Sequence, residues 1–344
     1  MISKAFKSIT LNDDPLPWLL EPDVNNPGVR YFVLRDLLGR SDDDPEVGKA
    51  RTDVMTQGPV PAILGAQHSE GYWVKPGGGY WPSYRATVWQ IIFLAELGAD
   101  PHDERVQRGC EYLLSHCIAA NGAFSMSERP VPSKAIHCLN GDLTHALFRL
   151  GYVNDSRLQA AGNWQALAIT GAEQIRYYKS GTTGPNFACV ANQAQPCAWG
   201  ATKAMKALVS ISPRQRTPAV QRAIELGVKF LLSRDPAVAD YPYIERVNSN
   251  WFKFGFPLSY SSDVLETVTV LAALGYGNDP QLVNALHLIL SKQGEQGRWT
   301  LEKTLNGKMW IDIEEKGKSS KWVTFRVLRV LRMIDGMHTS GVVF

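Results

Sequence analysis

The chain has 344 residues, of which 44% are hydrophobic, 10% aromatic and 20% charged, so a large core can form and an intrinsically disordered chain is excluded. The formal net charge is only +3, whereas a nucleic-acid-binding protein is expected to be more basic. No run approaches the roughly 20 apolar residues of a membrane-spanning helix. Met1 to Asp14 lacks the apolar core of a signal peptide. Five cysteines in a chain of this size indicate reduced thiols and predict a cytoplasmic protein.

In chain order, apolar helices alternate with amphipathic ones. Apolar segments end at a Leu–Gly pair, as at 97–98, 150–151 and 274–275, where the glycine can cap a helix. Asp or Thr follows within a few residues and can cap the next helix, so the two helices are antiparallel neighbours. The second helices, expected over 46–56, 105–116, 219–232 and 281–291, carry an apolar stripe and form an outer layer. The first helices, such as 264–274, form an inner layer.

A sharper motif, Q-x3-G-x-W, follows two of the outer helices, from Gln67 to Trp73 and from Gln293 to Trp299. In this motif the Gln side chain can hydrogen-bond to free backbone carbonyls at the end of a helix, and Gly lets the chain turn. The aromatic ring can then pack back onto the helix end. Over about residues 25 to 335 this pattern resembles the repeat of the squalene–hopene cyclases, within the terpenoid cyclase and protein prenyltransferase superfamily. The upstream aromatic half of that repeat is missing.

The resemblance implies an all-α fold, an α/α toroid with about six inner helices inside about six outer ones. We therefore expect a single toroid domain over 1–344, with an N-terminal extension over 1–25 and repeats over about 26–335. Connections from outer to inner helices are long, at 74–83, 125–133, 180–196, 240–257 and 300–319. They must emerge at one end of the barrel, which we call the long-loop end and expect to carry function.

The long loops and the nearby starts of inner helices are rich in aromatic and cationic residues. An electropositive, aromatic-lined mouth suits an anionic ligand with an apolar body, such as an isoprenoid diphosphate, and aromatic faces can stabilise a carbocation. The residues expected to bind substrate are Trp81, Tyr84, Arg85, Trp89, Lys179, Lys203, Trp251 and Tyr260.

Charged residues recur at one register of the inner helices. Asp142 and Glu266 stand nine residues before the terminal glycine, and a looser alignment adds Lys203 and Arg326. We expect these four side chains to point into the barrel and approach one another. A buried carboxylate beside cations is either a positioned acid or base, or a member of a structural ion-pair network.

Asp263 is the preferred catalytic acid, with Asp142 as a second acid or base and Glu266 as their modulator. Asp263 and Glu266 are three residues apart and share a helix face, although a capping role for Asp263 is the alternative. His137 opens a polar segment over 137–145 and is the remaining catalytic candidate.

Two motifs of the resembled superfamily are absent or altered. The Asp-x-Asp-Asp acid of alkene-protonating cyclases does not occur, and the acidic run from Asp42 to Glu46 fits a helix cap on an inter-helix turn. Prenyltransferases hold zinc with Asp, Cys and His, but their Asp-x-Cys spacing is missing here. Cys138, Cys189 and Cys197 are the candidate zinc ligands, and buried free thiols are the alternative.

The leading hypothesis is an isoprenoid-handling enzyme of cyclase, isomerase or prenyl-transfer type that uses a general acid or a carbocation in the toroid cavity. The alternatives are a carbohydrate-active α/α-toroid lyase or hydrolase and a non-catalytic ligand-binding toroid. The expected partner is a small apolar or anionic molecule, with no nucleic acid and with peripheral membrane contact left open. A closed aromatic cavity favours isoprenoids, an open polar groove favours glycans and a filled lumen favours a scaffold.

Overall fold

The structure, a computed structural model, describes residues 11–172, 184–189, 195–241 and 248–335. Within these ranges the chain is mostly helical, and the two strands β1 (Ala188–Cys189) and β2 (Gln195–Pro196) form one short antiparallel pair. The α-helices are α1 (Leu16–Leu20), α2 (Pro27–Phe32), α3 (Pro45–Thr56), α4 (Pro59–Gly65), α5 (Thr87–Leu97), α6 (Glu104–His116), α7 (His137–Arg149), α8 (Ser156–Thr170), α9 (Ala198–Ser210), α10 (Pro218–Leu231), α11 (Val264–Leu271), α12 (Val283–Ser291) and α13 (Lys321–Ile334).

Shorter helical turns extend or connect these helices. The π-helical turns η2 (Val33–Leu37) and η7 (Ala272–Tyr276) continue α2 and α11. The 3₁₀ turns are η3 (Pro132–Lys134), η5 (Pro213–Gln215), η6 (Ser249–Phe252) and η8 (Pro280–Leu282).

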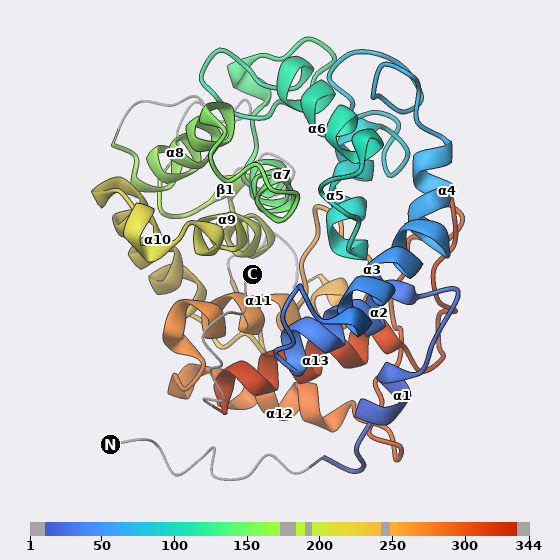
Figure 1. The fold of residues 1–344 in the computed structure, drawn as a ribbon. Coiled ribbons are helices and arrows are strands. Elements are labelled where there is room, and N and C mark those ends of the chain that lie inside the picture. The colour runs from blue at the N-terminus through green and yellow to red at the C-terminus, as the bar shows by residue number, and fades with distance from the viewer. Residues whose placement is uncertain (1–10, 173–183, 190–194, 242–247, 336–344) are drawn as a thin grey trace.

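The helices α2, α5, α7, α9, α11 and α13 follow one another around a central lumen (Figure 1). The ring closes where α2 lies between α5 and α13. Gly28 makes this closure possible, because a Cβ atom there would lie 2.4 Å from the carbonyl oxygen of Leu97 and 2.8 Å from the ring of Trp322. Within the described residues these six helices form the inner layer that the sequence predicts.

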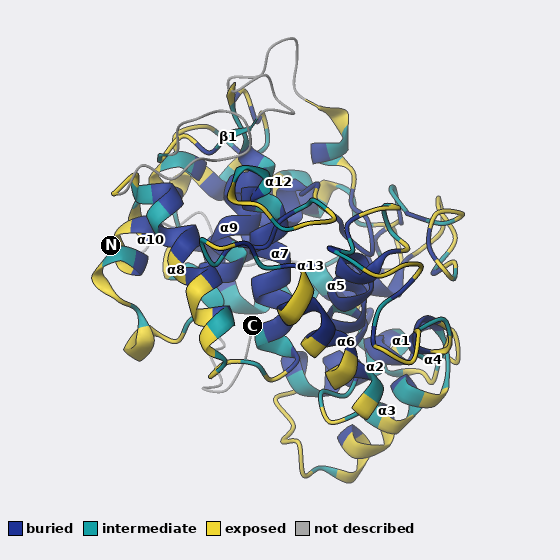
Figure 2. Ribbon diagram, turned by 90° about the horizontal axis from the view of Figure 1, so that it is seen from above, coloured by how far each residue is buried: buried dark blue, intermediate teal, exposed yellow. Residues whose placement is uncertain are grey.

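The outer layer consists of α3, α6, α8, α10 and α12, each packed against the inner helix that precedes it, while α4 packs against α3 and α5. Burial follows the same division, because α7 and α9 are almost wholly buried whereas α8 and α10 expose one side (Figure 2). The two layers confirm the predicted all-α toroid.

The turns from inner to outer helices lie at the opposite end from the long loops, and we call this the short-turn end. Asp44 accepts a hydrogen bond from the backbone N–H of Glu46, so it caps α3 as the sequence indicates. Asp155 and Asp279 cap α8 and η8 in the same way. Since all inner helices run in parallel, their N-termini lie at the long-loop end and their C-termini at the short-turn end.

The Q-x3-G-x-W motif ties each outer helix to the chain that follows it. The indole N–H of Trp73 donates to the carbonyl oxygen of Ile63 at 2.7 Å, and that of Trp299 donates to Ile289 at 2.7 Å. Both indoles are fully buried and satisfy carbonyls at the ends of α4 and α12. The two copies of the motif therefore perform the same structural role, one before α5 and the other before α13.

Candidate functional site

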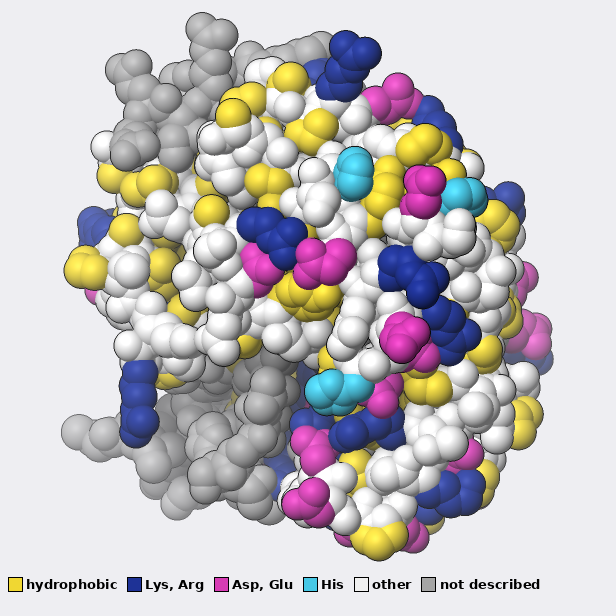
Figure 3. All heavy atoms as spheres, turned by 45° about the horizontal axis from the view of Figure 1, so that its top comes forward, with side chains coloured by type: hydrophobic (Ala, Val, Ile, Leu, Met, Phe, Trp, Pro, Cys, Tyr) yellow, Lys and Arg dark blue, Asp and Glu magenta, His cyan; other side chains and the backbone are white. Residues whose placement is uncertain are grey.

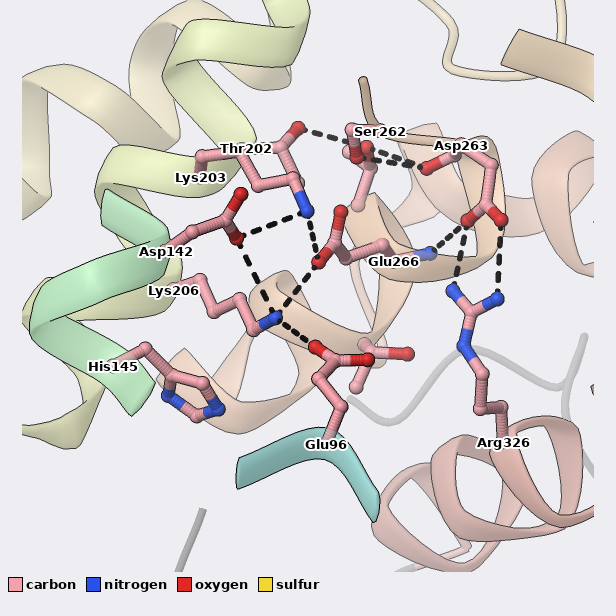
Figure 4. A network of polar contacts seen from close by, with 12 residues as sticks. Glu96, Asp142, His145, Thr202, Lys203, Lys206, Ser262, Asp263, Glu266 and Arg326 are labelled. Carbon is pink, nitrogen blue, oxygen red and sulfur yellow. Dashed lines mark hydrogen bonds and ion pairs between the residues drawn. The ribbon is translucent and has the colours of Figure 1, made fainter. Parts of the chain in front are cut away.

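The lumen holds a network of buried charged side chains from four inner helices (Figure 4). The Lys203 ammonium of α9 lies 3.0 Å from Asp142 Oδ1 of α7 and 3.0 Å from Glu266 Oε1 of α11. One turn further along α9, Lys206 Nζ lies 2.7 Å from Glu96 Oε1 of α5, 3.2 Å from Glu266 and 3.7 Å from Asp142. The sequence-based alignment thus brings Asp142, Lys203 and Glu266 together as expected.

This lumen network, formed by Glu96, Asp142, Lys203, Lys206 and Glu266, contains three carboxyl groups and two ammonium groups. With every group ionised it carries one surplus negative charge in a buried environment, which is unfavourable. Burial raises the pKa of Asp142 to about 6, although Lys203 and Lys206 act in the opposite direction. The network therefore retains one proton more readily than an exposed cluster would, and Asp142 is its main site.

The other two carboxyl groups of the network remain ionised. Burial alone would raise the pKa of Glu266, but the positive charges of Lys203, Lys206 and Arg326 bring it down to about 2. The pKa of Glu96 is also lowered, since Lys206 and Lys203 outweigh the effect of its burial. Because these groups share the same cations, they titrate as a unit rather than independently.

Asp263, the preferred acid of the sequence analysis, has a different role. Its side chain accepts the backbone N–H of Glu266 at 2.7 Å and so caps α11. Both of its oxygens also accept from the guanidinium of Arg326, at 3.0 and 3.1 Å, in a buried bidentate pair. The cap and the bidentate pair occupy both oxygens of the side chain, so the geometry favours the capping and pairing alternative over a proton-donating role.

Two adjoining cavities lie along the C-terminal halves of the inner helices. The deep cavity, of about 60 Å³, is lined chiefly by Phe32, Glu96, His145, Arg149, Lys206, Phe256, Glu266, Trp322, Phe325, Arg326 and Arg329. The outer cavity, of about 230 Å³, is lined chiefly by Tyr31, Phe32, Arg35, Asp36, Asp42, Arg51, Pro101, His102, Phe148 and Arg149. Phe32 and Arg149 border both cavities, which places the two side by side.

The two cavities lie toward the short-turn end, where the sequence predicts no depression. The outer cavity is bounded by Gly98, Pro101 and Leu150, which belong to the short inter-helix turns. Loop residues Phe256 and Leu258 pack into the wall of the deep cavity. The long loops over 180–196 and 240–257 lie partly outside the described residues, so a functional depression at the long-loop end stays a prediction.

At the long-loop end the expected substrate-binding aromatics form a packed cluster. The ring of Trp89 lies 5.2 Å from those of Tyr80 and Tyr84 and 6.4 Å from that of Tyr260. Trp89 is buried, whereas Tyr260 and Trp81 are about half exposed. Burial, assisted by Tyr260, raises the pKa of Tyr84 to about 12. The cluster brings these residues together but lies outside both cavities.

The remaining sequence-predicted binding residues do not converge on the lumen. Trp251 is buried and donates its indole N–H to the carbonyl oxygen of Pro236 at 2.8 Å, which is a structural anchor. The exposed Arg85 donates to the carbonyl oxygen of Lys308 and stacks on Trp310, and Lys203 is occupied by two carboxylates rather than open to a head group. Lys179 lies outside the described residues.

His137 faces the outer layer instead of the lumen. Its imidazole lies 2.5 Å from the side-chain amide of Gln165 and beside the ring of Trp164, both on α8. Burial lowers the pKa of His137 to about 3, so the ring is neutral. The expected catalytic role of His137 therefore finds no support in its position.

The three candidate zinc ligands lie near one another. Burial raises the pKa of Cys138, and a hydrogen bond with Cys189, together with burial, raises that of Cys197. Among the residues that the structure describes, no three or more His, Cys, Asp or Glu side chains are arranged to hold a metal ion.

The face of the molecule shown in Figure 3 has no large area of one charge sign, because Lys and Arg side chains there are interspersed with Asp and Glu. Over the described ranges, no helix combines the length and the apolar character needed to cross a membrane. On that face, no area of one charge sign competes with the lumen as a candidate site.

The sequence analysis did not select several residues that line the lumen, although the spacing along their helices could have placed them there. His145, Lys206, Thr269 and Arg329 each lie three residues after an aligned charged position, so they occupy the same helix face one turn further on. All four line the deep cavity. The same alignment, extended by one turn, would have found them.

Comparisons with known proteins identify no family. No protein-family model matches the sequence, and no curated protein matches it. Among solved structures, the apo type II terpene cyclase MstE from Scytonema aligns with 90% of this chain and 88% of its own, at 15% identity and a TM-score of 0.45. Variants of that enzyme with its substrate geranylgeranyl dihydroxybenzoate or its product merosterolic acid A align at 12% and 14% identity, with TM-scores of 0.30 and 0.31. The substrate complex covers 80% of this chain and 94% of its own, and the product complex 81% and 95%. Likeness at this level says nothing about the activity of the present chain.

Proposed function

We propose that the protein is an isoprenoid-handling enzyme that performs general acid–base catalysis in the toroid lumen. The observation that carries the proposal is the surplus carboxyl group of the lumen network, whose proton is held by Asp142 with a pKa of about 6. A pKa near the operating pH is what general acid–base catalysis requires. A purely structural network would be expected to balance its charges instead.

Asp142 and Glu266 have different roles in the proposed catalysis. Asp142 lies behind the cavity wall and stores the proton, while Glu266 lines the deep cavity and shares the cation Lys203 with it. Lys203 lies 3.0 Å from both carboxyl groups, so it can give one of its protons to Glu266 and take the proton of Asp142 in its place; a proton that Glu266 removes from substrate returns by the reverse exchange. Asp142 acts as the reservoir and Glu266 as the group that meets the substrate.

The aromatic wall of the deep cavity favours an isoprenoid over a sugar. The rings of Phe256 and Trp322 stack with centroids 4.1 Å apart, and those of Phe32 and Phe325 stack at 5.9 Å. Aromatic faces stabilise the developing positive charge that follows protonation of an alkene. About 60 Å³ is comparable to a few water molecules, so a chain end enters the deep cavity and the rest of a short substrate occupies the outer cavity.

The test is solvent deuterium incorporation. The protein is incubated in D₂O with a panel of short prenyl alcohols, acids and phosphates, and products are analysed by mass spectrometry. Asp142→Asn and Glu266→Gln should each lower incorporation at least about 100-fold, whereas Asp53→Asn, in an exposed pair on α3, should not. Turnover that persists in Asp142→Asn refutes the assignment. Binding of prenyl compounds by the wild type without conversion supports the alternative of a ligand-binding toroid.

A further inference from the structure

Arg149 occupies a distinctive position between the two cavities. It is the last residue of α7, and its guanidinium lies over the ring of Phe32 at 4.6 Å from the centroid. Both Arg149 and Phe32 line the deep and the outer cavity. Any molecule that passes from the short-turn end toward the lumen network must therefore contact this cation–aromatic pair.

Every other cation that lines either cavity has a carboxylate partner. The pairs are Arg35 with Asp42 at 3.1 Å, Arg51 with Asp42 at 2.7 Å, Lys206 with Glu96 at 2.7 Å, Arg326 with Asp263 at 3.0 Å and Arg329 with Asp36 at 3.5 Å. Arg149, in contrast, forms no ion pair and donates no side-chain hydrogen bond within the described part of the chain. Among the described residues, its five N–H donors have no acceptor.

The energetics of this arrangement point to a missing anion. A part-buried cation without a partner is costly, because it loses hydration without gaining a compensating charge. Burial accordingly lowers the pKa of Arg149; Asp36 and the more distant Glu96 oppose this effect, and the neighbouring Arg329 adds to it. The C-terminal end of α7 accounts for a positive charge at this position, since it offsets the helix dipole. It does not account for the absence of a hydrogen-bond acceptor.

We propose that Arg149 is the anchor of an anion-binding site at the short-turn end, which takes a small ligand that bears one carboxylate or phosphate group on a short apolar chain. The planar guanidinium fork matches both groups in bidentate geometry. Because the surrounding cations are already neutralised, a single anionic group fits better than a diphosphate. This deepens the proposed function, on which it rests for the apolar chain in the lumen.

Calorimetric titration tests the site without turnover. The probes are octanoate and octyl phosphate, with octanol as the uncharged control of equal chain length. Wild-type protein should bind one of the anionic probes at least about tenfold more tightly than octanol, as expected for a charge-assisted bidentate hydrogen bond. The tighter of the two anions identifies the ligand as a carboxylate or a phosphate. Equal affinity for octanol and both anions overturns the proposal.

Substitutions distinguish anion binding at Arg149 from a general effect of charge and from the proposed catalysis. Arg149→Met should lose about 10- to 100-fold in affinity for the preferred anion, while Arg157→Gln, which removes the same charge from the start of α8, should retain it. Retention of anion affinity by Arg149→Met refutes the proposal. If that variant fails to fold, Arg149→Lys keeps the charge but loses the fork, and it should weaken binding several-fold. Asp142→Asn should bind the anion normally, so loss of the proposed catalysis and loss of this site are distinguishable.

Discussion

Replacement of Asp142 by Asn tests whether the lumen network holds a surplus proton. The rise in pKa from the ordinary 3.8 to about 6 corresponds to about 3 kcal/mol, since one pKa unit is worth about 1.4 kcal/mol. Between about pH 4 and pH 6 the folded state holds a proton that the unfolded state has released. The free energy of unfolding of the wild type should therefore fall as the pH rises through this window. Because Asn does not ionise, the free energy of unfolding of Asp142→Asn should not show this decrease.

Glu266 contributes with the opposite sign and in a different window. Its pKa is lowered from 4.5 to about 2, so its contribution to stability is complete above about pH 4.5 and is lost as the pH falls toward 2. Measurements from pH 4.5 upward thus isolate Asp142. Lys203 keeps Glu266 as a partner in the variant, so no cation is left unpaired.

The assay is urea denaturation of wild type and Asp142→Asn at a series of pH values. The stability difference between variant and wild type should shift in favour of the variant by about 2 kcal/mol from pH 4.5 to pH 7. Asp53→Asn, on the exposed face of α3, controls for the substitution itself. If Asp142→Asn is instead destabilised by about 3–5 kcal/mol above pH 6, the ionised carboxylate is a structural ion-pair partner and the reasoning is wrong.

Four further substitutions probe the frame around the network. Asp263→Asn should cost about 3–5 kcal/mol in chemical denaturation because it leaves the buried Arg326 unpaired; a tolerance equal to that of Asp142→Asn would contradict the assigned roles. Gly141→Ala should destabilise by at least about 1–3 kcal/mol, since its Cβ would lie 2.2 Å from a backbone oxygen of α9. Gly162→Ala on α8, whose Cβ would make an ordinary contact with Ile211 at 3.5 Å, should be neutral or stabilising in the same melt. Trp73→Phe leaves a buried carbonyl unsatisfied and should cost about 1–3 kcal/mol, and a melting temperature equal to wild type would show that the motif is not structural.

The sequence predicted the toroid and the central part of the network for one reason, which is the repeat. A Leu–Gly pair after the helices of Asp142 and Glu266 fixes the register, so both residues could be placed on the lumen face without any structure. Lys206 lies in the same register one turn beyond Lys203, but the sequence analysis did not select it. Local spacing along a helix is thus sufficient to predict which face a residue occupies.

Sequence could not predict the two cavities toward the short-turn end. Loop length shows where a connection is long, but not which of its residues pack inward, as Phe256 does when it lines the deep cavity. Nor could it assign Asp263, which is equally compatible with a cap, an ion pair or an acid until Arg326 is placed 3.0 Å from it. Pairing depends on which side chains meet across the lumen, and spacing along one helix does not contain that information.

The ion pairs of the lumen also explain why Arg149 is suited to bind a ligand. Arg329 joins α13 to Asp36 of η2, and Lys206 reaches past α7 to Glu96 of α5, so neighbouring and facing inner helices are linked around the cavities. The C-terminal end of a helix carries a partial negative charge, which basic residues offset and carboxylates increase. If the basic residues near these helix ends served only to offset the dipoles, carboxylates beside them would be unfavourable. Their presence indicates that the pairs hold the cavity wall in place. A rigid wall around one cation that has no partner among the described residues lowers the ordering cost of binding, because the site is formed before the anion arrives.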